Sequence, residues 1–441
     1  MVMGVAGVYL ALFAPADPTL QQAGAIYSVI SALACVLVLR IYPGRPFTAG
    51  FVYLFLFTLF HGGLLVSTAL GQEVDLINDR DSQWYYTNAT TRAAIIASWA
   101  VVAFTAGYSA LTRRAKPSDR RDQSPTGTRA LAGPILTLAG VVWWFAIALV
   151  AGVSLFGSTY TTWLTLTETL PTPYVYLVMG IGMGAAGASR ATLPRRLALT
   201  AFVLFAIPAF LIGLRGEVII PAAAYLVAMT RRRNTRLRWW MAVVPLVALS
   251  AGSYVRATRT TTSGTAMGTL DDANPLHGLT ELGYTIRPLS LVVDRLAAGE
   301  ENSGWETYLS PFKRLIGENI FGMETLGVLE NDAVFRTFVT DRVGPIGGSP
   351  AAEAYRAFGL TGAIIVLAAI GLLLAFVENR PISTANDALI GMLAFPLYLW
   401  IRNDFTPVPL SMAVVLVLWL LVYHRPSMRP DDFASDRPQE L

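Results

Sequence analysis

Long runs of apolar residues alternate with short polar turns along almost the whole chain. A helix rises about 1.5 Å per residue, so about 20 apolar residues span the hydrocarbon core of a bilayer. A helix also satisfies its own backbone hydrogen bonds within lipid. The pattern therefore predicts an all-α polytopic integral membrane protein with about twelve transmembrane helices. The runs are 1–15, 22–41, 47–70, 91–111, 130–153, 172–189, 197–214, 216–230, 239–255, 352–377, 385–401 and 408–424.

The first run begins at the N-terminus, as a signal peptide would. It lacks the basic start and the small-residue cleavage site of such a peptide, so we expect 1–15 to be a retained span.

One polar stretch, 256–351, is too long to be a simple connector, and we expect it to form a large extracytoplasmic loop. Within it, 281–296 and 307–326 mix apolar and charged residues at helical spacing. This pattern predicts amphipathic helices that lie on the bilayer or fold into the mouth of the bundle. The expected division is 1–255 with transmembrane helices 1–9, 256–351 as the loop, 352–424 with helices 10–12, and 425–441 as a cytoplasmic tail.

Composition and charge agree with a membrane protein. Apolar residues make up 54% of the chain and charged residues 14%, against about 25% charged in soluble domains. All but two of the 33 basic residues are arginines, and basic residues favour cytoplasmic loops. With the N-terminus inside, 20 basic residues face the cytoplasm, 8 lie in the long loop and 5 occupy other outer positions. Both termini are therefore expected to be cytoplasmic.

Several function classes are excluded by the sequence. Cys35 is the only cysteine, which excludes intrachain disulfides and CxxC chemistry. No GxxxxGK[ST], HExxH or GxSxG motif occurs. A net charge of +4 is too small to indicate nucleic-acid binding. We expect no metal and no cofactor, which leaves the outer arginines and acids as the candidate chemistry.

Three arginines lie at outer helix ends, where basic residues are otherwise few. Arg215 lies in a tight turn, Arg356 begins a very apolar helix, and Arg402 precedes a Pro-rich turn. A charge at membrane depth is costly and usually faces a polar cavity. The structural alternatives are a snorkelling side chain for Arg215, an ion pair with Glu353 for Arg356, and an ion pair with Asp404 for Arg402.

The long loop adds further candidates. Arg256 and Arg259 leave the ninth predicted span together, and Arg287 follows in the loop. Arginine suits phosphate and pyrophosphate because its planar fork donates two parallel hydrogen bonds and stays charged. His277 is the only histidine of the loop; it is either a base or an ordinary polar loop residue.

Several segments resemble the Wzy-type polymerases of O-antigen or oligosaccharide repeat units. The stretch 347–374 (GGSPAAEAYRAFGLTGAIIVLAAIGLLL) is similar to their Gly-Ser…Glu-x-Tyr-x-x-Phe-Gly-x-x-Gly segment. The turn 213–216 resembles their short outer Gly/Ser-x-Arg-Gly turn, and 281–287 and 303–309 resemble elements of their large loop. The number of spans, the orientation and the position of the long loop also agree.

The resemblance implies a glycosyltransferase that acts on the outer face of a bacterial cytoplasmic (inner) membrane. Such enzymes move a growing glycan from its undecaprenyl-pyrophosphate carrier to a second lipid-linked repeat unit and release the polyprenyl pyrophosphate. The leaving group carries the energy, so no cofactor is needed. The implied partners are the lipid-linked oligosaccharide donor and acceptor, the lipid bilayer and a chain-length regulator.

The resemblance also implies roles for individual residues. Arginines would neutralise the departing pyrophosphate, and a carboxylate or histidine would take the acceptor proton. Arg215 with Arg287 or Arg356 is expected at the pyrophosphate, and the base candidates are Glu281, Glu217, Glu353 and His277. The expected catalytic residues are Arg215, Glu281, Arg287, Glu353 and Arg356. The expected substrate-binding residues are Glu217, Arg256, Arg259, His277, Tyr284, Tyr308, Arg342, Tyr355, Arg402 and Asp404.

Two alternatives remain open from the sequence. An O-antigen ligase-like transferase would use the same donor with another acceptor. A lipid-linked oligosaccharide flippase would place charges along its central helices, whereas the candidate residues here gather at one membrane face.

Overall fold

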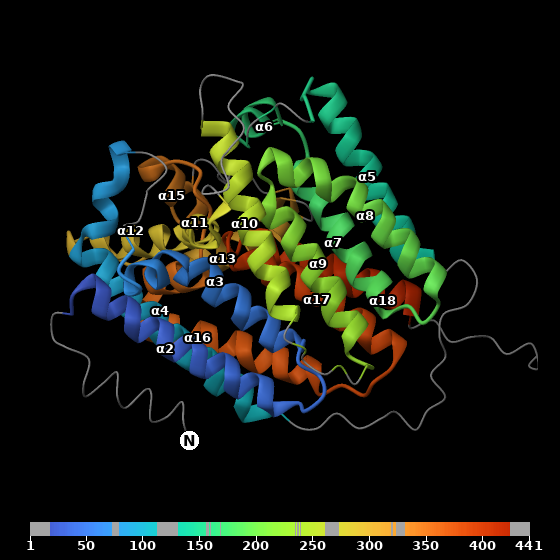
Figure 1. Ribbon diagram of the computed structural model, residues 1–441, viewed down its shortest axis with the longest axis horizontal. Coiled ribbons are helices and arrows are strands. Elements are labelled where there is room, and N and C mark those ends of the chain that lie inside the picture. The colour runs from blue at the N-terminus through green and yellow to red at the C-terminus, as the bar shows by residue number, and fades with distance from the viewer. Residues whose placement is uncertain are drawn as a thin grey trace, which may run out of the picture.

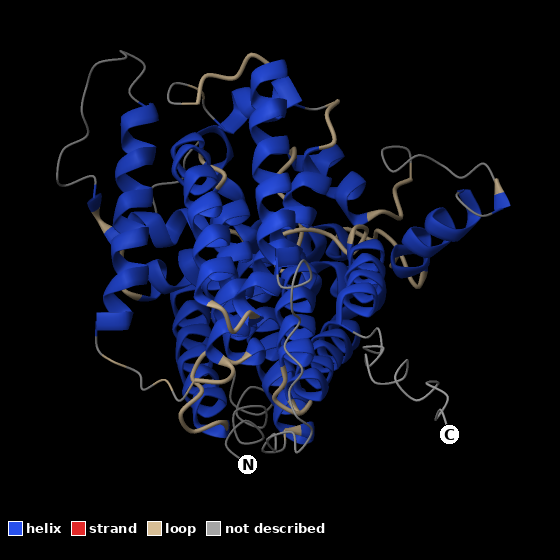
Figure 2. Ribbon diagram, turned by 90° about the vertical axis from the view of Figure 1, so that its right-hand side faces the viewer, coloured by secondary structure: helices blue, strands red, loops and turns tan. Residues whose placement is uncertain are grey.

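The computed structural model describes residues 18–72, 79–112, 131–260, 273–318, 321–322 and 331–423, apart from positions 156, 157, 159, 168, 234, 236, 237 and 239. In this part of the chain the regular structure is helical and no strand occurs (Figure 2). The helical elements are α2 (Leu20–Ile41), α3 (Ala49–Ala69), η1 (Asp79–Tyr86), α4 (Asn88–Leu111), α5 (Ala132–Val150), α6 (Tyr160–Thr167), α7 (Thr172–Ala188), α8 (Thr192–Ile212), α9 (Arg215–Thr230), α10 (Trp240–Thr260), α11 (Pro275–Leu282), η4 (Gly283–Thr285), α12 (Ile286–Ala297), α13 (Glu306–Phe312), η5 (Lys313–Glu318), α15 (Phe335–Val343), α16 (Pro350–Glu378), α17 (Thr384–Trp400) and α18 (Val408–Tyr423).

A helix covers each predicted apolar run from 22–41 onward. Six of the described helices are long and apolar enough to cross a membrane: α2, α3, α4, α5, α8 and α16. The prediction of an all-α polytopic membrane protein is confirmed. The number twelve stays a prediction, because the run 1–15 lies outside the described residues and six helices meet both criteria. The predicted tail 425–441 also lies outside them.

The predicted loop 256–351 differs from the structure at its edges and in its elements. Helix α10 continues to Thr260, and α16 begins at Pro350. The segment 281–296 is not one helix, because the η4 turn separates α11 from α12. Helix α12 buries Ile286 and Leu289 in the main core, so it folds into the bundle.

The helices form two groups that share α7 and α9. Helices α2, α3, α4, α12, α16 and α17 contribute to one core, and α5, α6, α7 and α8 contribute to the other. Ile181 of α7 and Ala224 of α9 belong to the first core, whereas Met179 and Tyr225 of the same helices belong to the second. In Figure 1, α5, α7 and α8 lie on the right, and α2, α3 and α4 lie at the lower left. The start of α9 therefore lies between the two groups.

Buried charges join several helices at the C-terminal end of α9. Arg231, with 1% of its side chain exposed, lies 2.6 Å from Asp387 and 3.5 Å from Glu378. Its guanidinium also donates to the Glu378 carbonyl at 2.9 Å. Arg45 lies 3.6 Å from the carboxylate of Glu378. The sequence assigns these arginines only to membrane orientation. In the structure, Arg231 also connects the end of α9 to α16 and α17, and Arg45 contacts α16.

Helix α16 is broken near its start, although the apolar run 352–377 predicts one continuous helix. Phe358 (φ −144°, ψ 17°) and Gly359 (φ 65°, ψ −155°) are not helical. The Gly359 conformation is accessible to glycine almost alone. The break separates residues 350–357, called the half-helix below, from the apolar part of α16. All residues of the half-helix except Tyr355 are buried.

Candidate active site

The turn between α8 and α9 places Arg215 inside the protein. Gly213 adopts a left-handed conformation (φ 106°) that ends α8, so α9 begins two residues later. Arg215 is 6% exposed. Its guanidinium forms an ion pair with Glu281 of α11 and donates to the carbonyl of Gly252 on α10 at 2.7 Å. Arg215 is therefore a buried, paired cation, and the snorkelling alternative is wrong.

Arg402 lies beside Gly216, at the start of α9. A Cβ atom at Gly216 would lie 2.5 Å from Nη1 of Arg402, so the absence of a side chain allows this approach. No ion pair joins Arg402 to an acid in the described part of the chain, and Asp404 instead accepts from the Thr406 hydroxyl. The alternative of an Arg402–Asp404 pair is wrong. Arg402 thus adds a positive charge at a helix N-terminus, which itself favours anions.

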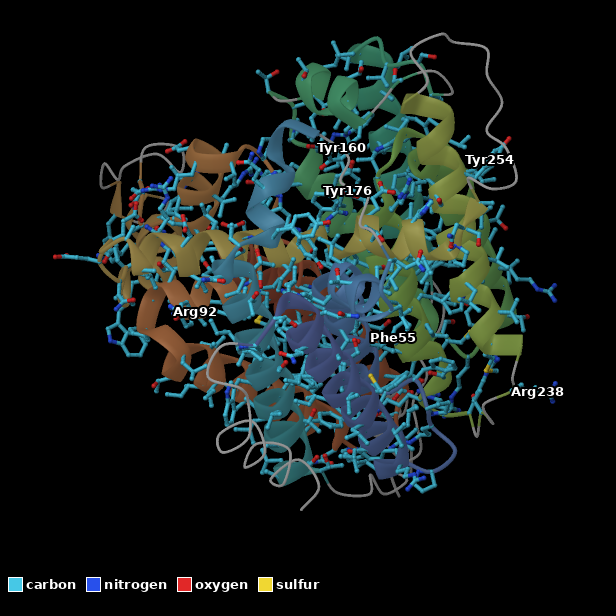
Figure 3. The ribbon with its side chains drawn as sticks, turned by 60° about the vertical axis from the view of Figure 1, so that its left-hand side comes forward. Phe55, Arg92, Tyr160, Tyr176, Arg238 and Tyr254 are labelled. Atoms are coloured by element: carbon cyan, nitrogen blue, oxygen red, sulfur yellow. The ribbon has the colours of Figure 1, made fainter. Side chains whose placement is uncertain are left out.

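Glu217 follows Arg215 by two residues, and two tyrosines lie within electrostatic range of it. The Oε2 atom of Glu217 is buried without a hydrogen-bond partner among the described residues. Its charge acts on the hydroxyls of Tyr160 and Tyr176, which lie near each other in Figure 3. Burial raises the pKa of Tyr160, while Arg402 and the exposed Arg336 oppose this shift. Arg215, Glu217, Glu281 and Arg402, with Tyr160 and Arg336, are called the α9 site below.

Glu353 lies on the half-helix and is tied to the turn after α17. Its Oε2 accepts from Trp400 Nε1 and from the Phe405 backbone N–H, both at 2.9 Å. Asp404, also buried, lies within electrostatic range. Burial raises the pKa of Asp404. Glu353 makes these contacts in place of the predicted local ion pair with Arg356.

Arg356 and Arg342 contact the same ring. Their guanidinium carbons lie 3.8 Å and 4.1 Å from the ring centroid of Phe338. Asp332 lies 3.6 Å from Arg356 and 3.2 Å from Arg342, and Glu300 lies 3.2 Å from Arg342. These five residues form the Phe338 cluster, in which both cations already have acidic partners. The alternative of a Glu353–Arg356 pair is therefore wrong.

The remaining loop candidates lie outside these two groups. The guanidinium carbon of Arg287 lies 5.4 Å from the ring centroid of Trp84, and the Tyr284 ring centroid lies 6.3 Å from that of Trp84. Tyr308 packs against Phe405 at 5.2 Å, and burial raises the pKa of its hydroxyl.

His277 and Tyr355 belong to neither the α9 site nor the Phe338 cluster. His277 is exposed on α11, and Tyr355 is half-buried against the main core. Arg256 and Arg259 occupy the end of α10, where the side chains lie outside the described residues.

The structure thus brings together residues that are far apart in the sequence, including two that no pattern indicated. Arg336 is one of eight bases in the long loop, and Tyr160 follows an apolar span without a motif. Their role depends on the fold, since the two lie within electrostatic range of each other and Tyr160 also lies within range of Glu217 at the start of α9.

The α9 site combines chemical groups suited to an anionic headgroup. Its guanidinium groups can neutralise phosphate, and Glu217 supplies a carboxylate oxygen that can accept a proton. Among the described residues, no three His, Cys, Asp or Glu side chains are grouped to hold a metal ion.

The fold and the site define a polytopic membrane protein with a buried arginine and carboxylate site at one end of its helices. The profile of the family described as "O-antigen polysaccharide polymerase Wzy" matches residues 2–425, and the chain belongs to this family. The chain is also 26% identical over 354 residues to Protein CapE of Staphylococcus aureus, which covers 77% of each chain. No solved structure matches.

Membership confirms the family resemblance found in the sequence. The protein is an integral membrane polysaccharide polymerase that carries out glycosyl transfer with lipid-linked oligosaccharide repeat units.

Proposed function

We propose that this polymerase joins polyprenyl-pyrophosphate-linked repeat units on the extracytoplasmic face of the bacterial cytoplasmic membrane. A hydroxyl of the incoming lipid-linked unit attacks the anomeric carbon of the growing chain. The new bond joins that oxygen to the anomeric carbon, and the bond from the carbon to the pyrophosphate breaks. The hydroxyl proton passes to a base, and polyprenyl pyrophosphate leaves. Both lipids bring anionic headgroups to the membrane surface.

The observation that carries this proposal is the pair of arginines at the start of α9. Arg402 lies against Gly216, one residue from Arg215, and has no acidic partner among the described residues. Developing negative charge on a leaving pyrophosphate would be stabilised by such preorganised donors. We assign the pyrophosphate to Arg402 and Arg215. Arg356 and Arg287 become secondary candidates, because neither lies in the α9 site.

Glu217 is the base that the geometry favours. Its Oε2 has no hydrogen-bond partner in the described part of the chain, whereas Glu281 is paired with Arg215. Glu353 already accepts two hydrogen bonds, and His277 is exposed. Arg215 and Glu217 stand two residues apart in α9 and so point to different sides of the helix, but Tyr160 lies within electrostatic range of both Glu217 and Arg402.

The function is tested with purified protein in nanodiscs and lipid-linked repeat units, followed by gel separation of the glycans. A ladder of increasing length supports polymerisation. One product on a different acceptor would indicate a ligase, and unchanged glycan would indicate a transporter; either result would contradict the proposal.

The site is tested by Arg402→Ala and Glu217→Gln in the same assay. We expect turnover to fall about 10²–10³-fold in the first variant and about 10²–10⁴-fold in the second. Arg92→Ala is the matched control, because Arg92 is exposed on α4 and lies away from Tyr160 (Figure 3). Normal ladders from Arg402→Ala would contradict the assignment of the pyrophosphate.

A further inference from the structure

His61 is a fully buried histidine within α3, and the proposed chemistry gives it no role. Its Nδ1 lies 3.0 Å from the carbonyl oxygen of Phe57, and its Nε2 lies 2.6 Å from the hydroxyl oxygen of Ser349. Ser349 is 288 residues further along the chain and is also fully buried. The contact joins the interior of one membrane helix to the start of another.

The two contacts determine where the imidazole proton lies. A carbonyl oxygen only accepts, so Nδ1 carries the hydrogen and donates to Phe57. A buried charge without a counter-ion is costly, and neither neighbour of the ring is a carboxylate. The neutral ring therefore offers Nε2 as an acceptor, and the Ser349 hydroxyl donates to it.

The same hydroxyl caps the half-helix. Ser349 is the N-cap residue, and its oxygen accepts from the Ala352 backbone N–H at 3.3 Å. His61 thus orients the Ser349 hydroxyl, which caps the first turn of residues 350–357. The backbone of Gly348 donates to the Arg402 carbonyl at 2.8 Å, which connects this turn to the α9 site.

The position of the half-helix depends on its N-terminal end at Ser349, because its C-terminal end is the break at Phe358 and Gly359. Phe358 and Gly359 interrupt the helix, so the rest of α16 does not extend its hydrogen-bond ladder through them. The half-helix carries Glu353 and Arg356, and its position relative to Arg402 is set by contacts at residues 348–353.

We propose that His61 is a positioning residue for glycosyl transfer, acting through Ser349 on the half-helix and on Arg402. This inference rests on the function proposed above. A displacement of about 1 Å in a catalytic group can cost about 10²-fold in rate. Loss of the contact is expected to lower kcat at least tenfold, with a smaller change in KM.

Two substitutions of similar polarity separate the role of Nε2 from that of Nδ1. In His61→Gln the side-chain amide can reach the position of Nε2 and accept from Ser349, whereas in His61→Asn it reaches only that of Nδ1. We expect His61→Gln to keep most of the wild-type kcat and His61→Asn to lose at least tenfold. Equal kcat values for the two variants would overturn the proposal.

Ser349→Ala removes the same contact from the other side, and Ser383→Ala is its matched control. Ser383 caps α17 by accepting from the Asn386 N–H at 3.2 Å, without a histidine partner. Both variants lose a helix cap, and Ser349→Ala also leaves the buried Nε2 of His61 unpaired, so a larger drop in melting temperature is expected in Ser349→Ala, with a loss of kcat in that variant alone. Unchanged kcat in Ser349→Ala would contradict the inference. Absence of a ladder from the wild-type protein would instead contradict the proposed function.

Discussion

At the scale of single residues, the main constraint is the burial of charge. An unpaired buried charge is strongly unfavourable, whereas a paired or hydrogen-bonded one is tolerated. Arg215 meets this condition through Glu281, and Glu353 meets it through Trp400 and Phe405. The sequence indicated that Arg215 and Glu353 lie near the membrane surface, but it did not indicate these partners.

Asp404 offers a test of burial through pH. Its pKa is raised above the ordinary value of 3.8 by burial, so the folded protein keeps a proton that the unfolded chain has lost. The free energy of unfolding therefore falls as pH rises from 3.8 through the raised pKa. Asp404→Asn removes this titration. We expect the wild-type melting temperature in detergent to fall relative to that of Asp404→Asn as pH rises through the acidic range.

Parallel melting profiles for the wild type and Asp404→Asn would show that Asp404 titrates normally. The Thr406→Val variant serves as a second probe, because it removes the hydroxyl that donates to the Asp404 carboxylate. Loss of this bond removes a contribution that lowers the Asp404 pKa, so the pH-dependent fall should extend to higher pH.

At the scale of elements, α16 shows how a hydrophobic run conceals a break. An apolar run predicts a helix, but the spacing of apolar residues carries no information on one residue with positive φ. The Phe-Gly-x-x-Gly part of the family segment has a physical reason here. Gly359 takes the non-helical conformation, and a Cβ at Gly362 would lie 2.3 Å from the Ala354 carbonyl oxygen.

Gly359→Ala tests the break. The substitution forces a residue with a side chain into a conformation that costs about 1–3 kcal/mol. We expect a lower melting temperature and shorter glycan ladders, because relief of the strain would shift the half-helix.

The matched control is Gly152→Ala, at a glycine with φ 67° after α5 and with open space around it. This control should lower stability without shortening the ladder. Wild-type stability and ladders in Gly359→Ala would show that the break is not required.

At the scale of the whole molecule, the distribution of arginines predicts how the bundle crosses the membrane. The excess of 20 basic residues on one side over 5 at outer positions predicts that both termini lie in the cytoplasm. The same predicted orientation would place the α9 site outside, because Arg215 and Arg231 lie at opposite ends of α9.

Cysteine labelling tests this orientation. Cys35 is the only cysteine, so Cys35→Ala provides a background without thiols. Glu301→Cys and Arg233→Cys place thiols at exposed positions on the two predicted sides. A membrane-impermeant maleimide should label Glu301→Cys in intact cells and Arg233→Cys only after permeabilisation. The reverse pattern would contradict the proposed orientation and the outer location of the site.

The sequence by itself determined the class of protein, the positions of most helices and the family. These features depend on local patterns: apolar runs long enough for lipid, arginines between them, and short motifs around Arg215 and the start of α16. The structure refined the helix ends, divided α16 and placed α12 within the bundle.

The tertiary structure alone decided which charged and polar groups meet. Arg215 pairs with Glu281 across 66 positions, Arg231 with Asp387 across 156, and His61 with Ser349 across 288. The nearby partners suggested by the sequence, Glu353 for Arg356 and Asp404 for Arg402, were wrong. The physical reason is that a membrane helix fixes the depth of its residues through its own composition, whereas the neighbour at that depth depends on how separate helices pack.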